Sequence, residues 1–252
     1  MHYFFLEGHS LAGGFEVELA EQDLNHAYRV LRLKPGERVA VADALGKAFS
    51  GTVKISEPGK VLVILEEQLP AAESPLNLVL LYSMAKGEKM DLVVRQAVEL
   101  GIKRIIPLTT LRSIPRLDGQ KESKKIKRWQ NIARSAAAQC RRAFVPQIEP
   151  VRDLRAILPE FSKYRTLVPW EEESIISLGS VLKQPCPDNM AVLLFIGPEG
   201  GFESGEIDVI IKAGAQVVSL GPRILRTETA ATAAVTMIQA AWGDIEIEGD
   251  RQ

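Results

Sequence analysis

The hydrophobic pattern along the chain changes near residue 70. Before that point, short runs of β-type residues alternate with turns rich in glycine and proline. One helix is expected among them, over residues 22–33, before Lys34-Pro35-Gly36 breaks the pattern. Several short strands with one helix predict a small β-barrel, because closure into a barrel leaves no exposed strand edge. The expected strands span residues 2–6, 15–19, 39–41, 49–56 and 61–65.

Beyond a polar, proline-bounded stretch at residues 66–75, longer apolar runs alternate with amphipathic segments. This alternation is typical of an α/β fold in which a mostly parallel sheet carries helices on both faces. We therefore expect two domains, residues 1–70 and 76–252, joined by a linker. The expected strands are 76–82, 104–108, 165–168, 191–196 and 217–220. The expected helices are 89–100, 123–140, 151–158, 174–182, 205–213 and 228–242.

Composition narrows the class of protein. Apolar residues make up 46% of the 252 residues and charged residues 25%, as in ordinary globular domains rather than disordered chains. No apolar run approaches the ~20 residues that cross a bilayer, and the chain lacks the basic start of a signal peptide. The two cysteines, Cys140 and Cys186, cannot build a disulfide framework or a zinc knuckle. We expect a soluble, cytoplasmic protein with no membrane attachment.

The charge is strongly polarised, although the chain as a whole carries a formal net charge of only −1. Residues 103–142 contain twelve basic and only two acidic side chains. Such a basic stretch indicates a polyanionic partner, which would be RNA, DNA or a phosphorylated ligand. The plainer alternative is a solvated helix face with no partner.

A glycine-rich loop follows the expected strand at residues 191–196. Its sequence is Gly197-Pro198-Glu199-Gly200-Gly201, and its glycines permit a close backbone approach to a ligand at the carboxyl end of a strand. The loop matches neither a phosphate-binding P-loop nor a dinucleotide fingerprint. A tight turn before a helix opened by Glu203 is the alternative.

A second loop, at residues 220–230, contains two arginines, Arg223 and Arg226. Thr227 is the expected N-cap of the next helix, and Glu228 lies in its first turn, where the helix dipole favours an acid. The arginines are less easily explained by folding, and surface ion pairs with Glu228 or Glu199 are the alternative. The loop at residues 168–171, with its proline and tryptophan, is a weaker third candidate.

Other chemistries lack the residues that they need. All three histidines lie within the first 26 residues, so a histidine triad or a histidine metal site in the second half would need a residue from the small domain. Acidic residues show no metal-ligand spacing, and a two-carboxylate glycosidase has no local support. No metal is expected.

The two loops, extended to Phe202 and over Leu220–Ala230, closely resemble motifs of the bacterial 16S ribosomal RNA (uracil-N3)-methyltransferase family of the SPOUT superfamily. Shorter matches extend the resemblance over essentially the whole chain. The family more often has acids where this chain has Ser135 and Ala138, and Glu where it has Asp91. The shorter matches are Val30-Leu31-Arg32, Lys86-Gly87-Glu88-Lys89-Met90, Glu99-Leu100-Gly101, Arg112-Ser113, Arg128-Trp129, Gln139-Cys140, Arg142 and Val145-Pro146.

The resemblance implies a PUA-like β-barrel that binds RNA, followed by a SPOUT methyltransferase domain with a trefoil knot, in a homodimer. It also implies S-adenosyl-L-methionine as the cofactor, held by the knotted loops. Carried over by position, the cofactor-binding residues are Leu167, Val168, Pro169, Trp170, Ile196, Gly197, Pro198, Glu199, Gly200, Gly201, Leu220, Gly221, Arg223, Ile224, Leu225, Arg226, Thr229 and Ala230.

The implied activity is methylation of N3 of a specific uridine in the 16S rRNA of the small ribosomal subunit. Neutral uracil N3 bears a proton and attacks poorly, so the site needs a base or a positive charge. Arg226 is the candidate for orientation and charge stabilisation. Glu228 is the candidate orienting partner or proton route, with Glu199 as its rival. The expected RNA-binding residues are Arg29, Arg32, Arg112, Lys124, Lys125, Lys127, Arg134 and Arg142.

Two alternative functions remain open at this point. A ribose 2′-O-methyltransferase of the same superfamily would share the donor pocket but would not need to remove the N3 proton. A non-catalytic RNA-binding protein would use the barrel and the basic stretch and leave the loops empty.

Overall fold

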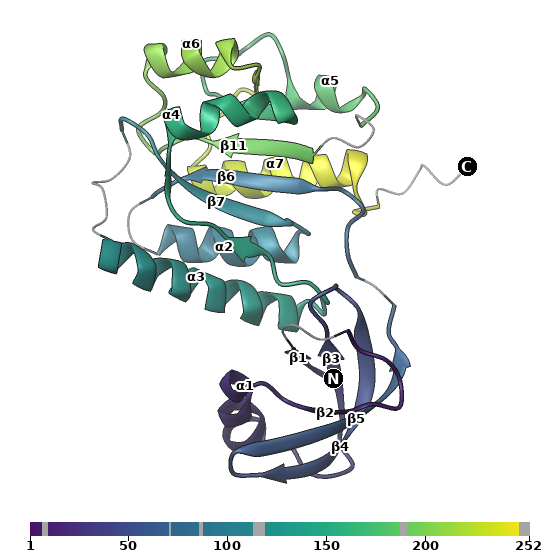
Figure 1. Ribbon diagram of the computed structural model, residues 1–252. Coiled ribbons are helices and arrows are strands. Elements are labelled where there is room, and N and C mark those ends of the chain that lie inside the picture. The colour runs from purple at the N-terminus through teal and green to yellow at the C-terminus, as the bar shows by residue number, and fades with distance from the viewer. Residues whose placement is uncertain (7–9, 71, 86–87, 113–118, 187–190, 247–252) are drawn as a thin grey trace. The chain divides into compact units, whose positions relative to one another are not determined.

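The computed structural model describes residues 1–6, 10–70, 72–85, 88–112, 119–186 and 191–246, which Figure 1 traces as a ribbon. Residue contacts divide the chain into two compact units. Unit 1 comprises Met1–Glu73 and Ser135–Val145, and unit 2 comprises Ser74–Arg134 and Pro146–Gln252. Lys86, Gly87 and Ser113 of the motifs above, and residues 114–118 of the basic stretch, lie outside the described residues. None of the helices within the described ranges is long and apolar enough to cross a membrane.

Unit 1 is built on a five-stranded sheet in the order β1-β3-β4-β5-β2. The β1–β3 pair is parallel and the other pairs are antiparallel. The sheet packs on an apolar core that includes Phe4, Val41 and Val63. A short helix, α1 (Glu21–Asn25), continues into a π-helical turn, η1 (His26–Val30). The strands are β1 (His2–Phe5), β2 (Glu16–Glu18), β3 (Arg38–Ala42), β4 (Ala48–Glu57) and β5 (Lys60–Gln68).

Unit 2 contains a parallel sheet in the order β12-β10-β11-β6-β7-β8, with β9 also paired to β7. Its central strand β6 is buried along its whole length, which explains why that segment is a continuous apolar run. The strands are β6 (Leu78–Ser83), β7 (Arg104–Thr109), β8 (Gln147–Ile148), β9 (Arg152–Asp153), β10 (Tyr164–Pro169), β11 (Ala191–Ile196) and β12 (Gln216–Val218).

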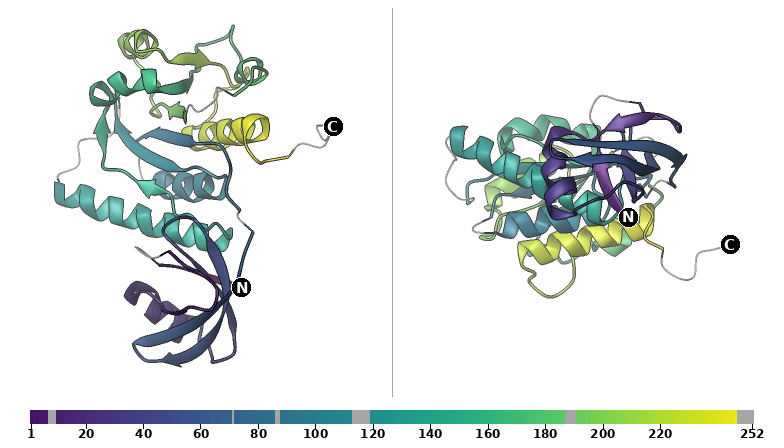
Figure 2. Two further views of the ribbon diagram at one scale, coloured as in Figure 1. Left: turned by 45° about the vertical axis from the view of Figure 1, so that its right-hand side comes forward. Right: turned by 90° about the horizontal axis from the view of Figure 1, so that it is seen from below.

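Helices cover both faces of this sheet, as the alternating sequence pattern predicts. Figure 1 shows α4 and α6 on one side of the sheet and α2 on the other. The long helix α7, yellow in Figure 2, packs against α2 and β11. Successive strand residues point to opposite faces, so Val79 and Leu81 enter the core beneath α4 and α6. The helices are α2 (Lys89–Glu99), α3 (Gly119–Gln139), α4 (Leu154–Ile157), α5 (Leu178–Leu182), α6 (Ser204–Lys212) and α7 (Thr227–Trp242), with a 3-10 turn η2 (Leu158–Lys163) after α4.

The structure differs from the expected elements mainly where they are short. The helix expected over 151–158 begins only at Leu154, because residues 152–153 pair with β7 as strand β9. Asp153 instead caps α4 by accepting a hydrogen bond from the backbone N–H of Arg155. The helix expected over 174–182 is reduced to α5, whose N-cap is Ser177.

Candidate active site

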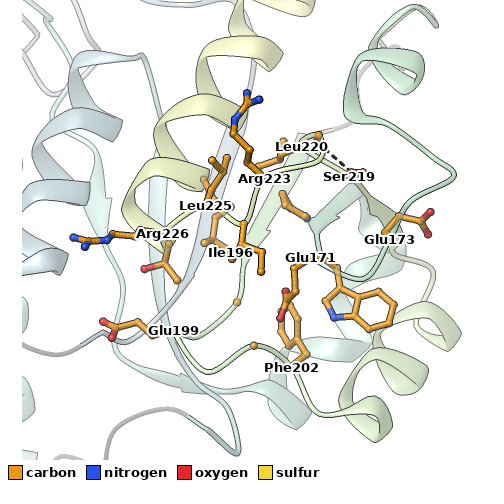
Figure 3. A pocket seen from close by; sticks show the side chains of 18 of the residues that line it. Glu171, Glu173, Ile196, Glu199, Phe202, Ser219, Leu220, Arg223, Leu225 and Arg226 are labelled. Atoms are coloured by element: carbon orange, nitrogen blue, oxygen red, sulfur yellow. Dashed lines mark hydrogen bonds between the residues drawn. The ribbon is translucent and has the colours of Figure 1, made fainter.

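Three neighbouring strands of unit 2 deliver the candidate loops to one edge of the sheet. β10 lies between β11 and β12, and Leu167 of β10 stands opposite Leu194 on one side and Gln216 on the other. Because parallel strands run in the same direction, the loops that follow them leave from the same edge. Together these loops line a cavity of about 820 Å³, seen from close by in Figure 3.

Most of the residues carried over from the family resemblance line this cavity. Leu167 and Val168 do not, because they are fully buried within the sheet. Gly200, Thr229 and the catalytic candidate Glu228 are also outside the lining. The expected residues that do line it are Pro169, Trp170, Ile196, Gly197, Pro198, Glu199, Gly201, Leu220, Gly221, Arg223, Ile224, Leu225, Arg226 and Ala230.

Sequence reasoning left several lining residues unassigned. Phe202, Pro222 and Thr227 stand inside the quoted motifs, so the motifs themselves could have identified them. Lys89 also belongs to a quoted motif, but it comes from a helix more than a hundred residues before the glycine-rich loop. The remaining unassigned lining residues are Glu171, Glu173, Ser174, Ser177 and Ser219.

Two glycines of the first loop are required by close contacts. A Cβ on Gly197 would lie 2.5 Å from the ring of Phe202, which is packed in the core. Gly201 has a positive φ of 70°, and a Cβ there would lie 2.2 Å from a carboxylate oxygen of Glu171. Larger residues would therefore displace the loop or the side chains that shape the cavity.

Arg112 fastens the same loop from outside the cavity. Its Nη1 donates a hydrogen bond of 2.8 Å to the carbonyl oxygen of Gly200, and its Nε lies 3.5 Å from Oε1 of Glu203. The buried carboxylate of Glu206 accepts the backbone N–H groups of Leu111 and Glu203. Arg112 was expected to bind RNA; its side chain is about half exposed beside these loop contacts, and RNA binding by Arg112 stays a prediction.

The start of α7 is arranged differently from the expectation. The N-cap is Arg226, and Thr227 is the first helical residue, so the prediction of Thr227 as N-cap is wrong. The reason is a distant partner: the Thr227 hydroxyl makes a 2.9 Å hydrogen bond with the phenol of Tyr82, from the end of β6. Arg226 is exposed, and Figure 3 shows its guanidinium directed away from Ile196.

The acids of the two loops pair with a lysine. Nζ of Lys89 lies 3.1 Å from Oε1 of Glu199 and 3.6 Å from Oε2 of Glu228. The alternative was that Arg223 or Arg226 pairs with these acids. Among the described contacts, both acids pair with Lys89 instead. One ammonium instead joins the loop after β11 to the first turn of α7.

Burial and hydrogen bonding shift two ionisations beside the cavity. Burial alone would raise the pKa of the Glu228 carboxyl, but its own backbone N–H, the charge of Lys89 and the Thr227 hydroxyl together hold this pKa below its ordinary value. Burial raises the pKa of the Tyr82 phenol to about 12. The hydrogen bond with Thr227 lowers this pKa, whereas the negative charges of Glu228 and Glu199 raise it further. At neutral pH the site therefore holds an ionised Glu228 and a neutral Tyr82.

The expected RNA-binding residues differ in their exposure. Lys124, Lys125 and Lys127 on α3, and Arg29 and Arg32 after α1, are exposed, whereas Arg134 is half-buried. Arg32 has a left-handed backbone, with φ of 53°.

Arg142 has to be reassigned. It is 2% exposed, and its guanidinium donates hydrogen bonds to both carboxylate oxygens of Glu73 within unit 1. The expectation that Arg142 contacts RNA is therefore wrong, because a guanidinium enclosed and paired in this way is not accessible to a phosphate group.

Two known protein families match most of the chain. Residues 72–239 match the RNA methyltransferase domain, and residues 19–66 match the RNA methyltransferase PUA domain. A ribosomal RNA small subunit methyltransferase E from Buchnera aphidicola is 31% identical, over 91% of this chain and 92% of the relative. The corresponding enzyme from Bacillus subtilis is 29% identical, over 86% and 87%.

Solved structures agree with the sequence matches. A ribosomal RNA small subunit methyltransferase E from Neisseria gonorrhoeae, bound to S-adenosyl methionine, superposes with a TM-score of 0.87 at 33% identity, covering 98% of this chain and all of that chain. A Legionella pneumophila structure in complex with the cofactor SAM also gives a TM-score of 0.87 at 33% identity, covering 96% of this chain and 98% of that chain.

The contacts of Arg112 predict that it orders the glycine-rich loop. In Arg112→Ala, the amide of Gly201, which is hydrogen-bonded to the Pro198 carbonyl, should exchange with solvent about 5-fold faster, corresponding to about 1 kcal/mol for a half-exposed charged hydrogen bond. Hydrogen exchange resolved by residue measures this effect. Arg155→Ala removes an exposed arginine of the same unit and serves as the matched control. Equal exchange in both variants would show that Arg112 does not hold the loop.

Proposed function

The chain belongs to the RNA methyltransferase family, and on this basis we propose that it transfers a methyl group from S-adenosylmethionine to N3 of a specific uridine in 16S ribosomal RNA of the small ribosomal subunit. The observation that carries this proposal is the cavity. The loops with the family motifs, far apart in the sequence, converge on one space of about 820 Å³. That volume is within the range of about 300–1,000 Å³ found for small-molecule sites.

The lining of the cavity suits S-adenosylmethionine. Ile196, Leu220 and Leu225 offer apolar surface for an adenine ring. The carboxylates of Glu171, Glu173 and Glu199 also line the cavity, and they complement a sulfonium cation and ribose hydroxyls. Trp170 lines the cavity, and its indole N–H is buried with no hydrogen-bond partner among the described residues. The residues that would hold the cofactor are the cavity-lining ones that the family resemblance implies. Leu167, Val168 and Gly200 lie outside the lining and would support the backbone of the residues that form it.

The chain's own residues must align the reactants and make N3 nucleophilic. S-adenosylmethionine, when bound, supplies a methyl group that is already activated, so no metal is needed. Alignment alone can lower a barrier by roughly 7 to 11 kcal/mol in well-oriented cases. The lowered pKa of Glu228 makes it a weak proton acceptor, and its contact with Lys89 favours an orienting role. Arg226 remains a candidate for orienting the RNA at the rim of the cavity.

The RNA would be held by Lys124, Lys125 and Lys127, which we call the basic side of α3, and by Arg29 and Arg32 after α1. Lys124, Lys125 and Lys127 are exposed and close in sequence, as phosphate contacts require. Arg32 adds an independent argument: a left-handed non-glycine residue costs roughly 1–2 kcal/mol, and strain of this kind gathers at functional sites. Because a paired uridine is stacked inside its helix, the target base must be flipped or already looped out.

The same family likeness supports the finer assignments. We infer a PUA-like RNA-binding domain over residues 1–70, a knotted SPOUT domain over 76–252, and action in the cytoplasm, where ribosomal subunits assemble. We also infer a homodimer, because Ile224 on the cavity rim and Ile175 are 87% and 90% exposed, and a second copy would cover such apolar side chains. A sedimentation mass of a monomer at micromolar concentration would contradict the dimer.

The decisive experiment for the reaction is identification of the product. Small ribosomal subunits from a strain that lacks the protein should gain one methyl group per subunit on incubation with the protein and S-adenosylmethionine. Mass spectrometry of the digested rRNA should assign this group to the base, as N3-methyluridine. A 2′-O-methylated ribose would establish the alternative methyltransferase. No transfer, together with no heat of S-adenosylmethionine binding in calorimetry, would leave an RNA-binding protein.

The basic side of α3 gives a separate prediction. Replacing Lys124, Lys125 and Lys127 by Glu should weaken RNA binding at every sequence, and each lost phosphate contact should flatten the salt dependence by about one unit. Binding of a 16S rRNA fragment, titrated at several salt concentrations, measures both effects. The control replaces Lys183 and Lys212, which lie outside the basic stretch, by Glu. Unchanged affinity at low salt would show that the basic residues form only a solvated helix face.

A further inference from the structure

Lys89 is fixed where the two motif loops meet the beginning of α2. It is the first residue of that helix, lines the cavity and is one-third exposed. Its ammonium lies 3.1 Å and 3.6 Å from carboxylates of two separate elements, Glu199 and Glu228. A surface lysine moves freely on a four-carbon stem, whereas two partners on different elements hold this one at a defined point. An ammonium has three donors, so these two partners leave one N–H group for a third acceptor.

The other charges around Lys89 are already engaged. On its own helix, Asp91 accepts hydrogen bonds from Arg128 and from the indole N–H of Trp129, and Glu88 lies 3.9 Å from Arg128. From β6, the Tyr82 phenol is neutral and bound to Thr227, as described above. Two further cations, Arg223 and Arg226, line the cavity, and Figure 3 shows the guanidinium of Arg226 directed away from Ile196. Of these three cations, Lys89 is the one that the described contacts pair with two acids of the site.

We propose that Lys89 is a catalytic residue, whose ammonium stabilises the negative charge that develops on the uracil ring as N3 loses its proton. Glu199 and Glu228 act as positioning residues for the ammonium. This inference rests on the function proposed above, and on the N3 specificity in particular. A fixed charge that needs no reorganisation during the reaction is the most effective form of such stabilisation.

The chemistry of the step balances without a further reactant. The N3–H bond breaks and its proton passes to solvent water. The N3 electron pair forms the new bond to the methyl carbon while the carbon–sulfur bond breaks, and a neutral thioether leaves. The negative charge of the intermediate uracil anion is shared with its two carbonyl oxygens, which accept hydrogen bonds from an ammonium. Stabilising this anion raises its population near neutral pH, where N3 is otherwise protonated.

The test compares two RNA substrates that differ only in the acidity of N3. One carries uracil at the target position and the other 5-fluorouracil, whose N3 loses its proton more readily. Lys89→Met should lower the turnover on uracil RNA by about 10²- to 10³-fold, as loss of one stabilising donor does elsewhere. With 5-fluorouracil RNA the loss should be at least about 10-fold smaller, because the anion then needs less stabilisation. Lys89→Arg should retain most of the activity, since it keeps the charge.

The controls separate this role from a structural one. Calorimetry should give the same affinity for S-adenosylmethionine in Lys89→Met and in the wild type. Lys89→Gln is the second variant, to be used if Lys89→Met does not fold. The same pair of substrates is tested with Arg226→Met.

Equal losses on both substrates would overturn the proposal. So would rescue by 5-fluorouracil in Arg226→Met but not in Lys89→Met, because Arg226 would then supply the charge. A loss of S-adenosylmethionine affinity large enough to explain the fall in turnover would also overturn it. The proposed function fails independently, and only if the wild type forms no N3-methyluridine.

Discussion

The parallel pairing of β10 with β11 and with β12 is the constraint on which the site depends. Because the three strands share one direction and lie in register, their last residues reach the same edge of the sheet, at Pro169, Ile196 and Val218. Residues separated by some fifty positions in the sequence thereby become neighbours around a single cavity. The helices hold this edge in place. Phe202, which follows the glycine-rich loop, packs in the core beneath α4 and α6 and thereby anchors the loop.

Charge then links elements that the sheet only brings near to one another. Lys89 connects α2 to the loop after β11 and to the start of α7, and Arg112 ties the segment after β7 to the carbonyl of Gly200. Partly exposed ion pairs of this kind contribute little to the free energy of unfolding. Their effect is to limit the conformations of loops that have few apolar contacts of their own. An RNA methyltransferase needs such order, because the reacting atoms must be aligned within a fraction of an ångström.

The sequence predicted the parts of the molecule that depend on local pattern. The buried strand β6 and the amphipathic helix α2 follow from apolar runs and from periodicity, and most of the cavity lining followed from the motifs. The errors concern contacts between distant residues. Threonine is a favoured N-cap residue, but the Thr227 hydroxyl is hydrogen-bonded to Tyr82, 145 positions away. Arg142 belongs to a basic run, yet Glu73, 69 positions away, determines its burial. Such pairings depend on tertiary contacts that neither residue's neighbours reveal.

The ion pair between Arg142 and Glu73 also bears on how the chain could be divided. Residues 135–145 belong to the same compact unit as the first 73 residues, so this unit is assembled from two separate stretches of the gene product. A chimera that exchanged only the N-terminal stretch with a relative would have to preserve the acid that meets Arg142. Losing one partner of a buried pair costs about 3–5 kcal/mol, a large share of the stability of an ordinary domain. Recombination between relatives is therefore expected to move both stretches together, or to change Glu73 and Arg142 as a pair.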